Sequence, residues 1–272
     1  MIQALRRHFL GLLAVGTLAA IGLSLSAAPA RAAQPVRIGL LAFTSHSPTM
    51  IADAKGFFAD QQLQADFVVF QAAQPMAVAI ASGDIDFGVT AISGGLISLA
   101  HKGAVKVIGG ALQETPEIEG QKVLVSKAAF ERGMTSPDKL KGARFGVTTA
   151  GSSFHYMAHK LADKSGYARS DLTIVPLQKV PAVIAALKTG QVDAWTIVPN
   201  IAAGLTTDGS VVDIGKVADY VDNYQVTTVF TSAAIADKKP ELVKRFMLAY
   251  SKGSTCTTRP LSTRRCPRPT ST

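Results

Sequence analysis

The stretch IASGDIDFGVT, Ile80–Thr90, is followed later in the chain by the similar stretch LKTGQVDAWTI, Leu187–Ile197. Both contain an apolar residue, two spacers, Gly, a polar residue, a β-branched residue and Asp, in that order. Gly at a helix end reaches the positive φ that lets the chain leave the helix, and Asp suits the turn that follows. We interpret Gly83, Gly190 and the two Asp residues as backbone features. A predicted strand starts within each stretch. We expect the ligand-binding residues to lie at the carboxyl end of that strand.

The two stretches belong to a repeated unit of alternating strand and helix patterns. The first copy reads VRIGLLAF, SPTMIADAKGFFAD, FVVF, QPMAVAIASG and IDFGVT, and the second reads ARFGVTT, SSFHYMAHKLADKSGY, LTIVPL, VPAVIAALKTG and VDAWTIV. The interval from Arg37 to Arg144 is the same as the interval from Asp86 to Asp193. Short connections between such elements favour parallel strands with right-handed crossovers. The repeat therefore predicts two α/β lobes, each with helices on both faces of a sheet.

The N-terminal segment has the pattern of a cleavable signal peptide. Arg6 and Arg7 precede an uncharged apolar run, Phe9–Leu25, and the sequence Ala-Arg-Ala follows at residues 30–32. Small residues on either side of one spacer mark a signal peptidase site. We predict a signal peptide over residues 1–32, cleavage after Ala32 and export to a periplasm. An uncleaved membrane anchor is the alternative, because the apolar run is nearly long enough to span a bilayer.

The C-terminal segment SKGSTCTTRPLSTRRCPRPTST, residues 251–272, differs in character from the rest of the chain. It is rich in Arg, Thr and Pro, and it holds both cysteines, Cys256 and Cys266. Such a segment without apolar periodicity is predicted to be disordered. We predict that it results from a reading-frame shift near Gly253. In that case PELVKRFMLAYSKG is the last helix, and the first lobe lacks part of its apolar cover.

The formal charge of +9 arises at the two ends of the chain. Of the 28 Lys and Arg residues, three precede residue 34 and five follow residue 250, which leaves 20 against 19 acidic residues. A body that is so nearly neutral gives no compositional support for nucleic-acid binding. The body also contains no cysteine. We therefore expect a hydrophobic core, rather than disulfides, to hold it together.

Candidate ligand-binding residues follow the strands of both copies, because ligands bind beyond the carboxyl ends of strands in open parallel sheets. In each copy a hydroxyl-rich loop after the first strand also opens a helix, where free N–H groups can hold an anion without a basic side chain. The predicted ligand-binding residues are Thr44, Ser45, His46, Thr90, Ser93, Thr149, Ser152, Ser153, Trp195 and Asn200. For each Ser and Thr, plain helix N-capping is the alternative. Trp195 is either a core aromatic or a platform for an apolar ligand group.

The signals for catalysis and for cofactors are weak. His155 and His159 stand at i and i+4 of one predicted helix, but the Glu of a zincin motif and a third ligand are absent from the pattern. The glycine motifs of nucleotide-binding loops and the GxSxG elbow are also absent from the sequence. We predict no catalytic residues, no metal site and no cofactor.

The chain resembles the periplasmic substrate-binding proteins of nitrate, sulfonate and taurine importers, the SsuA/THI5-like or NMT1-like family. The resemblance is carried by AKGFFADQQLQADFVVF, AIASGDIDFGVT, KLKGARFGVTTAGSS and ALKTGQVDAW. It implies a type II periplasmic binding fold, with two doubly wound α/β lobes joined by a two-strand hinge. Lobe I would comprise residues 34–116 and 219–250, and lobe II residues 117–218. GALQETPEIEGQKVLVS and NYQVTTVFTS would be the two crossovers.

The resemblance implies that the protein captures a small organic anion, such as a sulfonate or a carboxylate, between its lobes. Its partners would be this small anionic or polar ligand and an ABC permease of the inner membrane, without nucleic acid, and we expect a monomer. Two other classes stay open. One is an enzyme on the same scaffold, because the family includes thiamine-pyrimidine synthase relatives, although their cysteine-rich iron-site motif is absent from the body of this chain. The other is a periplasmic sensor subunit that reports ligand binding to a receptor.

Overall fold

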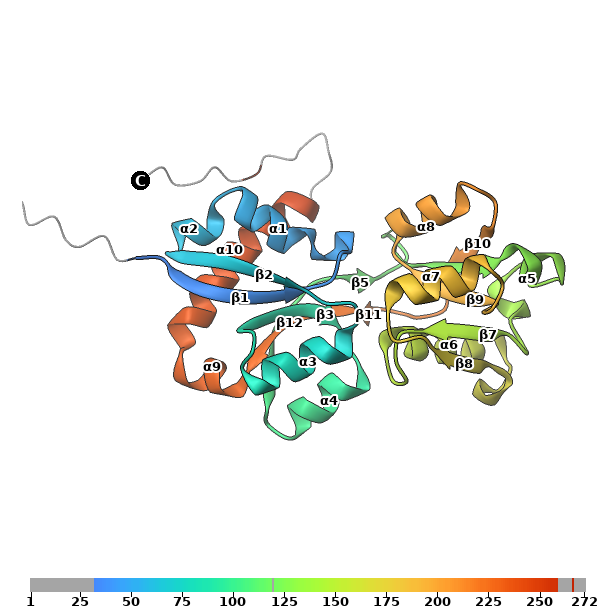
Figure 1. Cartoon of the computed structure of the whole chain (residues 1–272), viewed down its shortest axis with the longest axis horizontal. Helices are drawn as coiled ribbons and strands as arrows, with labels where there is room; N and C mark the ends of the chain where they lie inside the picture. The colour runs from blue at the N-terminus through green and yellow to red at the C-terminus, as the bar shows by residue number, and fades with distance from the viewer. Residues whose placement is uncertain (1–31, 119, 259–265, 267–272) are drawn as a thin grey trace, which may run out of the picture. The chain divides into compact units, whose positions relative to one another are not determined.

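The computed structural model describes residues 32–118, 120–258 and 266, and its elements form two α/β lobes (Figure 1). Each lobe contains a five-stranded sheet with helices packed against it. A separate two-stranded sheet lies on the two chain segments that pass between the lobes. The prediction of two α/β lobes joined by a two-strand hinge is confirmed.

The first lobe is built around a sheet with the strand order β2-β1-β3-β12-β4. Its strands are β1 (Gln34–Leu40), β2 (Leu63–Val69), β3 (Phe87–Ala91), β4 (Val105–Gly110) and β12 (Thr227–Ser232). Its helices are the 3-10 helix η1 (Thr44–His46), α1 (Ser47–Ala54), α2 (Phe57–Asp60), α3 (Ala73–Ser82), α4 (Gly94–His101), α9 (Ala233–Lys238) and α10 (Pro240–Thr258). The single helix predicted over residues 47–60 divides into α1 and α2, because Gly56 adopts a φ of 71° between them.

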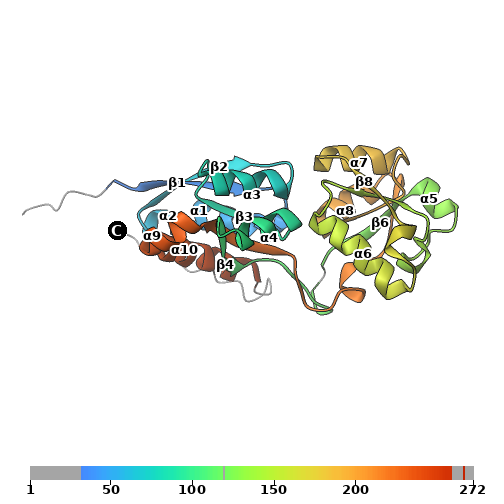
Figure 2. The same cartoon turned by 90° about the horizontal axis from the view of Figure 1, so that it is seen from below.

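Apolar side chains pack on both faces of this first sheet. On one face, a cluster with α1, α2 and α10 includes the buried side chains of Phe57, Phe87 and Phe246. The rings of Phe87 and Phe246 stack with their centroids 3.9 Å apart. The other cluster includes Met76 and Ile80 of α3 and side chains of α4. Figures 1 and 2 show α3 and α4 on the opposite side of the sheet from α1 and α2.

The second lobe repeats this arrangement around a sheet with the order β10-β6-β9-β7-β8. Its strands are β6 (Lys122–Ser126), β7 (Arg144–Val147), β8 (Thr173–Pro176), β9 (Ala194–Ile197) and β10 (Val211–Lys216). Its helices are α5 (Lys127–Glu131), η2 (Pro137–Lys139), α6 (Ser153–Ser165), η3 (Arg169–Asp171), α7 (Val180–Lys188), α8 (Pro199–Thr206) and η4 (Val217–Asp219). One core cluster holds the lobe together and includes Phe145, Met157 and Leu161.

The hinge is the antiparallel pair of β5 (Gln113–Glu114) and β11 (Tyr224–Gln225). The chain passes from the first lobe to the second through β5 and returns through β11. Within the hinge, the buried carboxylate of Glu114 accepts hydrogen bonds from the Gln121 backbone N–H, at 2.9 and 3.1 Å. The hinge is therefore fastened to the segment that enters the second lobe.

Both large sheets are mixed, so the expectation of parallel strands is wrong for part of each sheet. β1 runs parallel to β2 and β3, and β7 runs parallel to β8 and β9. β12 is antiparallel to β3 and β4, and β6 is antiparallel to β9 and β10. Both β6 and β12 follow a hinge strand and start beside the carboxyl end of a neighbour, Thr227 opposite Ala91 and Lys122 opposite Ile197. A strand that enters from that end must run against the parallel strands.

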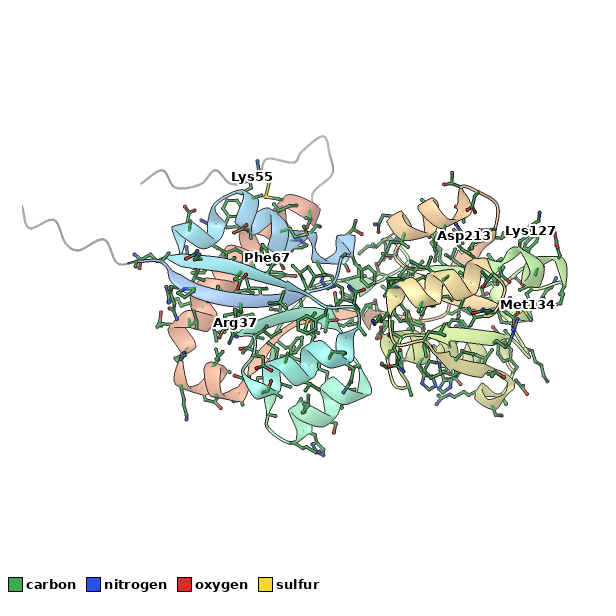
Figure 3. All side chains as sticks on the ribbon, viewed as in Figure 1. Arg37, Lys55, Phe67, Lys127, Met134 and Asp213 are labelled. Atoms are coloured by element: carbon green, nitrogen blue, oxygen red, sulfur yellow. A yellow bond between two sulfur atoms is a disulfide. The ribbon has the colours of Figure 1, made fainter. Side chains whose placement is uncertain are left out.

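The repeated Asp has the same structural role in both lobes. Asp86 accepts a hydrogen bond from the backbone N–H of Arg37 at 2.8 Å, and Asp193 accepts one from Arg144 at the same distance. The side chain of Arg37, labelled in Figure 3, donates to the carbonyl oxygen of Gly83. The side chain of Arg144 donates in the same way to the carbonyl oxygen of Gly190. The repeated motif thus ties a helix end and a strand start to the first strand of each copy of the repeat, β1 in the first lobe and β7 in the second.

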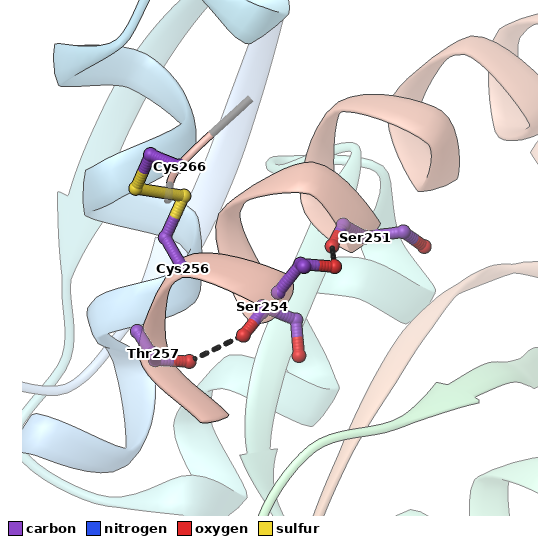
Figure 4. Close-up of a disulfide and its surroundings, with 6 residues drawn as sticks. Ser251, Ser254, Cys256, Thr257 and Cys266 are labelled. Atoms are coloured by element: carbon purple, nitrogen blue, oxygen red, sulfur yellow. Dashed lines mark hydrogen bonds between the residues drawn. A yellow bond between two sulfur atoms is a disulfide. The ribbon is translucent and has the colours of Figure 1, made fainter. Parts of the chain in front are cut away.

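Helix α10 continues to Thr258, which corrects the prediction of disorder from residue 251 for residues 251–258. Phe246, Ala249 and Cys256 are three and seven residues apart, which is helical spacing, and they are buried in one cluster of the first lobe. Cys256 forms a disulfide with Cys266 (Figure 4). The composition of this segment is unusual, but its buried positions keep the helical period, and this period decides the local structure. The other predicted tail residues, 259–265 and 267–272, lie outside the described residues.

The described part of the chain contains no helix that is both long and apolar enough to cross a membrane. The predicted signal peptide over residues 1–32 lies, apart from Ala32, outside the described residues.

Candidate functional site

A cavity is lined by residues of both lobes and of the segments that connect them. Most of its lining residues are buried. None of the lining residues in the described part of the chain is a Lys, Arg, Asp or Glu. The apolar lining residues are Leu41, Phe43, Ala72, Ala73, Ala91, Leu112, Phe154, Ile197, Val198 and Val226. The polar lining residues are Ser45, His46, Thr90, Gln121, Thr148, Ser152, Ser153 and Thr227.

Five of the ten predicted ligand-binding residues line this cavity, namely Ser45, His46, Thr90, Ser152 and Ser153. They come from η1, from the end of β3 and from the start of α6, where the two hydroxyl-rich loops and the strand end were expected to meet. Chain segments that are far apart in sequence therefore contribute to one site.

The other five predicted residues lie elsewhere. Thr44 and Asn200 are exposed and bond to each other, with the Thr44 hydroxyl donating to the Asn200 side-chain oxygen at 2.9 Å. Ser93 caps α4 by accepting a hydrogen bond from the Leu96 N–H, as the capping alternative predicts. The half-buried Thr149 does not line the cavity, whereas its neighbour Thr148 does.

Trp195 belongs to the core of the second lobe, so the ligand-platform interpretation is not supported. Its side chain is fully buried on β9, and its ring packs against Phe154 with the centroids 5.4 Å apart. Phe154 itself lines the cavity. Trp195 can therefore affect a ligand only through the position of Phe154.

His46 is the polar side chain whose hydrogen-bonding state is best defined. Its Nδ1 accepts a hydrogen bond from the backbone N–H of Leu41 at 2.9 Å, and the residue is 1% exposed. Burial lowers the pKa of His46 to about 4. The imidazole is therefore neutral at physiological pH, and because Nδ1 accepts, its proton is on Nε2. His46 can serve a ligand as a neutral N–H donor, without a positive charge.

The start of α6 supplies further donors to the cavity. Ser152 is the N-cap of α6, and its hydroxyl oxygen accepts a hydrogen bond from the His155 N–H. Ser153 and Phe154 occupy the first two helical positions, and their N–H groups have no intrahelical acceptor there. The positive end of the helix dipole lies at the same place. This arrangement can bind an anionic or a strongly polar group although no basic side chain lines the cavity.

The sequence did not identify three polar lining residues, Gln121, Thr148 and Thr227. Thr148 lies in the predicted hydroxyl-rich loop, and it lines the cavity in place of its predicted neighbour Thr149. Gln121 directly precedes β6, and Thr227 begins β12, the two antiparallel strands that follow the hinge. Neither position carries a sequence signal for a site, because its place at the cavity depends on how the chain crosses between the lobes.

Loops of the two lobes also contact each other directly around the cavity. The Gly94 N–H of the first lobe donates to the carbonyl oxygen of Gly151 in the second, at 2.8 Å. The Val180 N–H donates to the carbonyl oxygen of Gln71 at 3.4 Å. With the Thr44 contact described above, these bonds join the lobes at residues next to the lining residues Ser45, Ala72 and Ser152. The arrangement is suited to enclosing a small molecule rather than to binding a macromolecule.

No group of three or more His, Cys, Asp or Glu side chains that could hold a metal ion occurs among the described residues. The polar groups of the cavity are hydroxyls, one amide and one neutral imidazole. They can donate and accept hydrogen bonds around a ligand whose body contacts the apolar lining. The two lobes, the two-strand hinge and the cavity at their junction are the features of the periplasmic binding protein fold.

The chain belongs to the NMT1/THI5-like family, whose profile matches residues 43–260. A protein of Brucella abortus (strain 2308) that is provisionally named as a binding protein is 26% identical over 216 residues. That match covers 78% of this chain and 64% of the relative, so the chain spans less than two thirds of the length of the curated relatives it matches.

Solved structures share the fold at low sequence identity. The alkanesulfonate-binding protein SsuA from Xanthomonas axonopodis pv. citri, bound to MOPS, superimposes with a TM-score of 0.66 at 23% identity, over 80% of this chain and 72% of that one. The periplasmic nitrate-binding protein NrtA from Synechocystis PCC 6803 gives a TM-score of 0.71 at 14% identity, over 83% of this chain and 62% of that one. The predicted type II periplasmic binding fold is confirmed.

Proposed function

We propose that the protein is the solute-binding component of an ABC importer and that it captures a small organic molecule in the cavity between its lobes. The observation that carries the proposal is the position of the cavity, which both lobes line and beside which loops of the two lobes contact each other. Family membership and the fold support the same class of function. We further propose export to the periplasm, an inner-membrane permease as partner, a monomeric state and no enzymatic activity.

The chemistry of the cavity favours a ligand with an apolar body and one hydrogen-bonding head group. Apolar side chains such as Phe43, Leu112 and Ile197 would contact the body of the ligand. The head group would lie at the start of α6, near Ser153 and the Nε2–H of His46. A sulfonate or carboxylate fits, because helix-start N–H groups bind anions without a basic side chain.

A ligand panel tests this proposal. The panel contains aliphatic and aromatic sulfonates, the matching carboxylates and their neutral amides, each added at 1 mM to the purified protein. A ligand at 100 times its Kd adds about 2.7 kcal/mol to the free energy of unfolding, which is roughly 5–10 °C in Tm for a domain of this size. We expect such a shift for at least one acid, with a smaller one for its amide. The absence of a shift across the panel, with no binding by calorimetry, would contradict the proposal.

A further inference from the structure

Two histidines of α6 face each other outside the cavity described above. His155 and His159 are one helical turn apart, and their Nε2 atoms are 3.1 Å apart. Both are half-buried and line a second recess, together with residues that include Ser93 of the first lobe and Tyr224 of the hinge. The solute-binding proposal makes no use of this pair.

The surroundings of both imidazoles favour the neutral form. Burial lowers the pKa of His155, and the neighbouring His159 lowers it further. Burial also lowers the pKa of His159, Arg169 lowers it further, and Asp163 opposes the change. A neutral imidazole carries one lone pair that can bind a metal ion, whereas an imidazolium carries none.

We propose that His155 and His159 form a bidentate site for a divalent transition-metal ion that prefers nitrogen ligands, such as Zn²⁺, Ni²⁺ or Cu²⁺. Two His at i and i+4 on one helix face place their nitrogens toward a common point. Metal–nitrogen bonds of about 2.0–2.1 Å at a tetrahedral angle separate two ligand nitrogens by about 3.3 Å. The observed 3.1 Å requires only a small adjustment of the two rings. Imidazole suits these three metals, and the other coordination positions face the recess.

The ion would have two protein ligands, because the carboxylate nearest to the pair on α6 is already paired with an Arg. Asp163 lies one turn beyond His159, but both of its oxygens accept hydrogen bonds from Arg169, at 2.8 and 2.7 Å. Lys160 lies over the ring of Tyr156, 5.8 Å from its centroid. A cation held by two nitrogens beside these positive charges should exchange readily with solution. The site is therefore expected to load reversibly rather than to hold a permanent structural ion.

Metal binding would also change a hydrogen bond that lies beside a contact between the lobes. The Gly151 N–H donates to Nδ1 of His155 at 3.0 Å, so the proton of His155 is on Nε2. Coordination through Nε2 requires this proton to move to Nδ1, which can then no longer accept from Gly151. The carbonyl oxygen of the same Gly151 accepts the hydrogen bond from Gly94 of the first lobe. Metal loading would thus remove a hydrogen bond of the residue that also makes the Gly94–Gly151 contact.

Calorimetric titration of the oxidised full chain with ZnCl₂ and NiCl₂ at pH 7.5 tests the site. Two variants each remove one metal-coordinating imidazole while keeping a hydrogen-bonding group at that position. His155→Asn retains an oxygen that can accept from Gly151, and His159→Gln retains an amide. The control is His101→Gln, which changes an exposed histidine that does not line the recess. Circular dichroism and Tm check that each variant is folded.

We expect one ion to bind per wild-type chain and the control to match it. Each single variant should bind at least about tenfold more weakly, because even outer-shell changes cost 10–100-fold in metal affinity. The wild-type affinity should fall between pH 7.5 and pH 5.5, since protons compete for the imidazoles. Equal affinities of the wild type and His159→Gln, or no binding of either metal, would overturn the proposal. The solute-binding proposal would be unaffected by that result, because neither histidine lines the cavity.

Discussion

The Asp193 carboxylate accepts hydrogen bonds from both the backbone N–H and the guanidinium of Arg144, at distances of 2.8–3.0 Å. Arg132 donates to Oδ1 of the same carboxylate, which also accepts from Nη2 of Arg144. Asp86, its counterpart in the first lobe, accepts from the backbone N–H of Arg37. In both lobes, therefore, an Asp just before a strand, β3 or β9, accepts a hydrogen bond from the backbone of the neighbouring strand. The Asp of the second lobe accepts additional hydrogen bonds from two Arg side chains.

Replacing Asp193 with Ala should destabilise the protein more than replacing Asp86. Loss of the Asp193 carboxylate removes its ion pairs with Arg144 and Arg132. We expect the free energy of unfolding to fall by about 2–3 kcal/mol, a loss that is limited because both Arg side chains are half exposed and stay solvated. Asp86→Ala should cost about 1 kcal/mol. Urea unfolding of both variants measures the difference. Equal losses would show that the extra hydrogen bonds of Asp193 contribute nothing.

Asp193 should also contribute to the acid sensitivity of the protein. Burial raises the pKa of its carboxyl, but the hydrogen bonds from Arg144 outweigh burial and lower the pKa below 3.8. A group with a lowered folded-state pKa stabilises the protein above its unfolded pKa and loses this contribution as the pH falls through the folded value. Asp193→Ala should therefore show a smaller loss of stability than the wild type between pH 5 and pH 2. An identical pH dependence would contradict this assignment.

His46 allows a test that separates ligand binding from local structure. His46→Asn keeps an oxygen near the position of Nδ1 that can accept from the Leu41 N–H, but it removes the Nε2–H donor. His46→Gln keeps a donor near Nε2 and removes the acceptor. If Nε2–H binds the ligand, we expect the Asn variant to lose about 1–2 kcal/mol of binding free energy and the Gln variant to lose less. Calorimetry with a ligand from the panel measures both, and the reverse order would exclude His46 as a ligand donor.

His46 should also make stability fall at mildly acidic pH. Its folded-state pKa of about 4 is below the ordinary value of 6.5, so the unfolded state binds the proton more readily. Its contribution is complete above pH 6.5 and is lost as the pH falls toward 4, by up to about 3 kcal/mol. His46→Asn should remove this dependence. Denaturant unfolding at pH 7 and pH 4.5 measures the effect in both proteins.

The repeat made the two lobes predictable, because its constant spacing joined elements whose patterns could be read locally. The loops after strands also predicted where His46, Ser152 and Ser153 would meet. The mixed sheets could not be read in the same way, since the direction of β6 and β12 depends on the hinge rather than on their own residues. Trp195 illustrates a second limit. A strand-end aromatic suits a core or a site equally well in sequence, and only the packing against Phe154 distinguishes them.

Ser152 and Ser153 should respond differently to replacement by Ala, although both line the cavity. Ser152 caps α6, so Ser152→Ala should cost about 1 kcal/mol of stability. Ser153 caps nothing, and Ser153→Ala should leave stability nearly unchanged while weakening ligand binding by roughly 1–3 kcal/mol if its hydroxyl donates to a charged group. Tm and calorimetry on the two variants separate the effects. Unchanged affinity in Ser153→Ala would remove this hydroxyl from the site.

Glu114 in the hinge gives a pH effect of the opposite sign. Burial raises the pKa of its carboxyl above 4.5, and the hydrogen bond from the Gln121 N–H only partly opposes this. The folded state therefore binds the proton more tightly than the unfolded state. Stability must then fall as the pH rises from about 4.5 through the folded-state pKa. Glu114→Gln keeps an oxygen that can accept from Gln121 and removes the titration.

We expect Glu114→Gln to be more stable than the wild type at pH 7, and the difference to shrink toward pH 4, where the wild-type carboxyl is protonated. Urea unfolding at the two pH values measures this difference. Because Gln121 lines the cavity, ligand affinity provides a second readout. It should change little, since the amide oxygen of the variant can still hold the Gln121 backbone. A variant that is less stable than the wild type at pH 7 would show that the ionised carboxylate is needed to fasten the hinge.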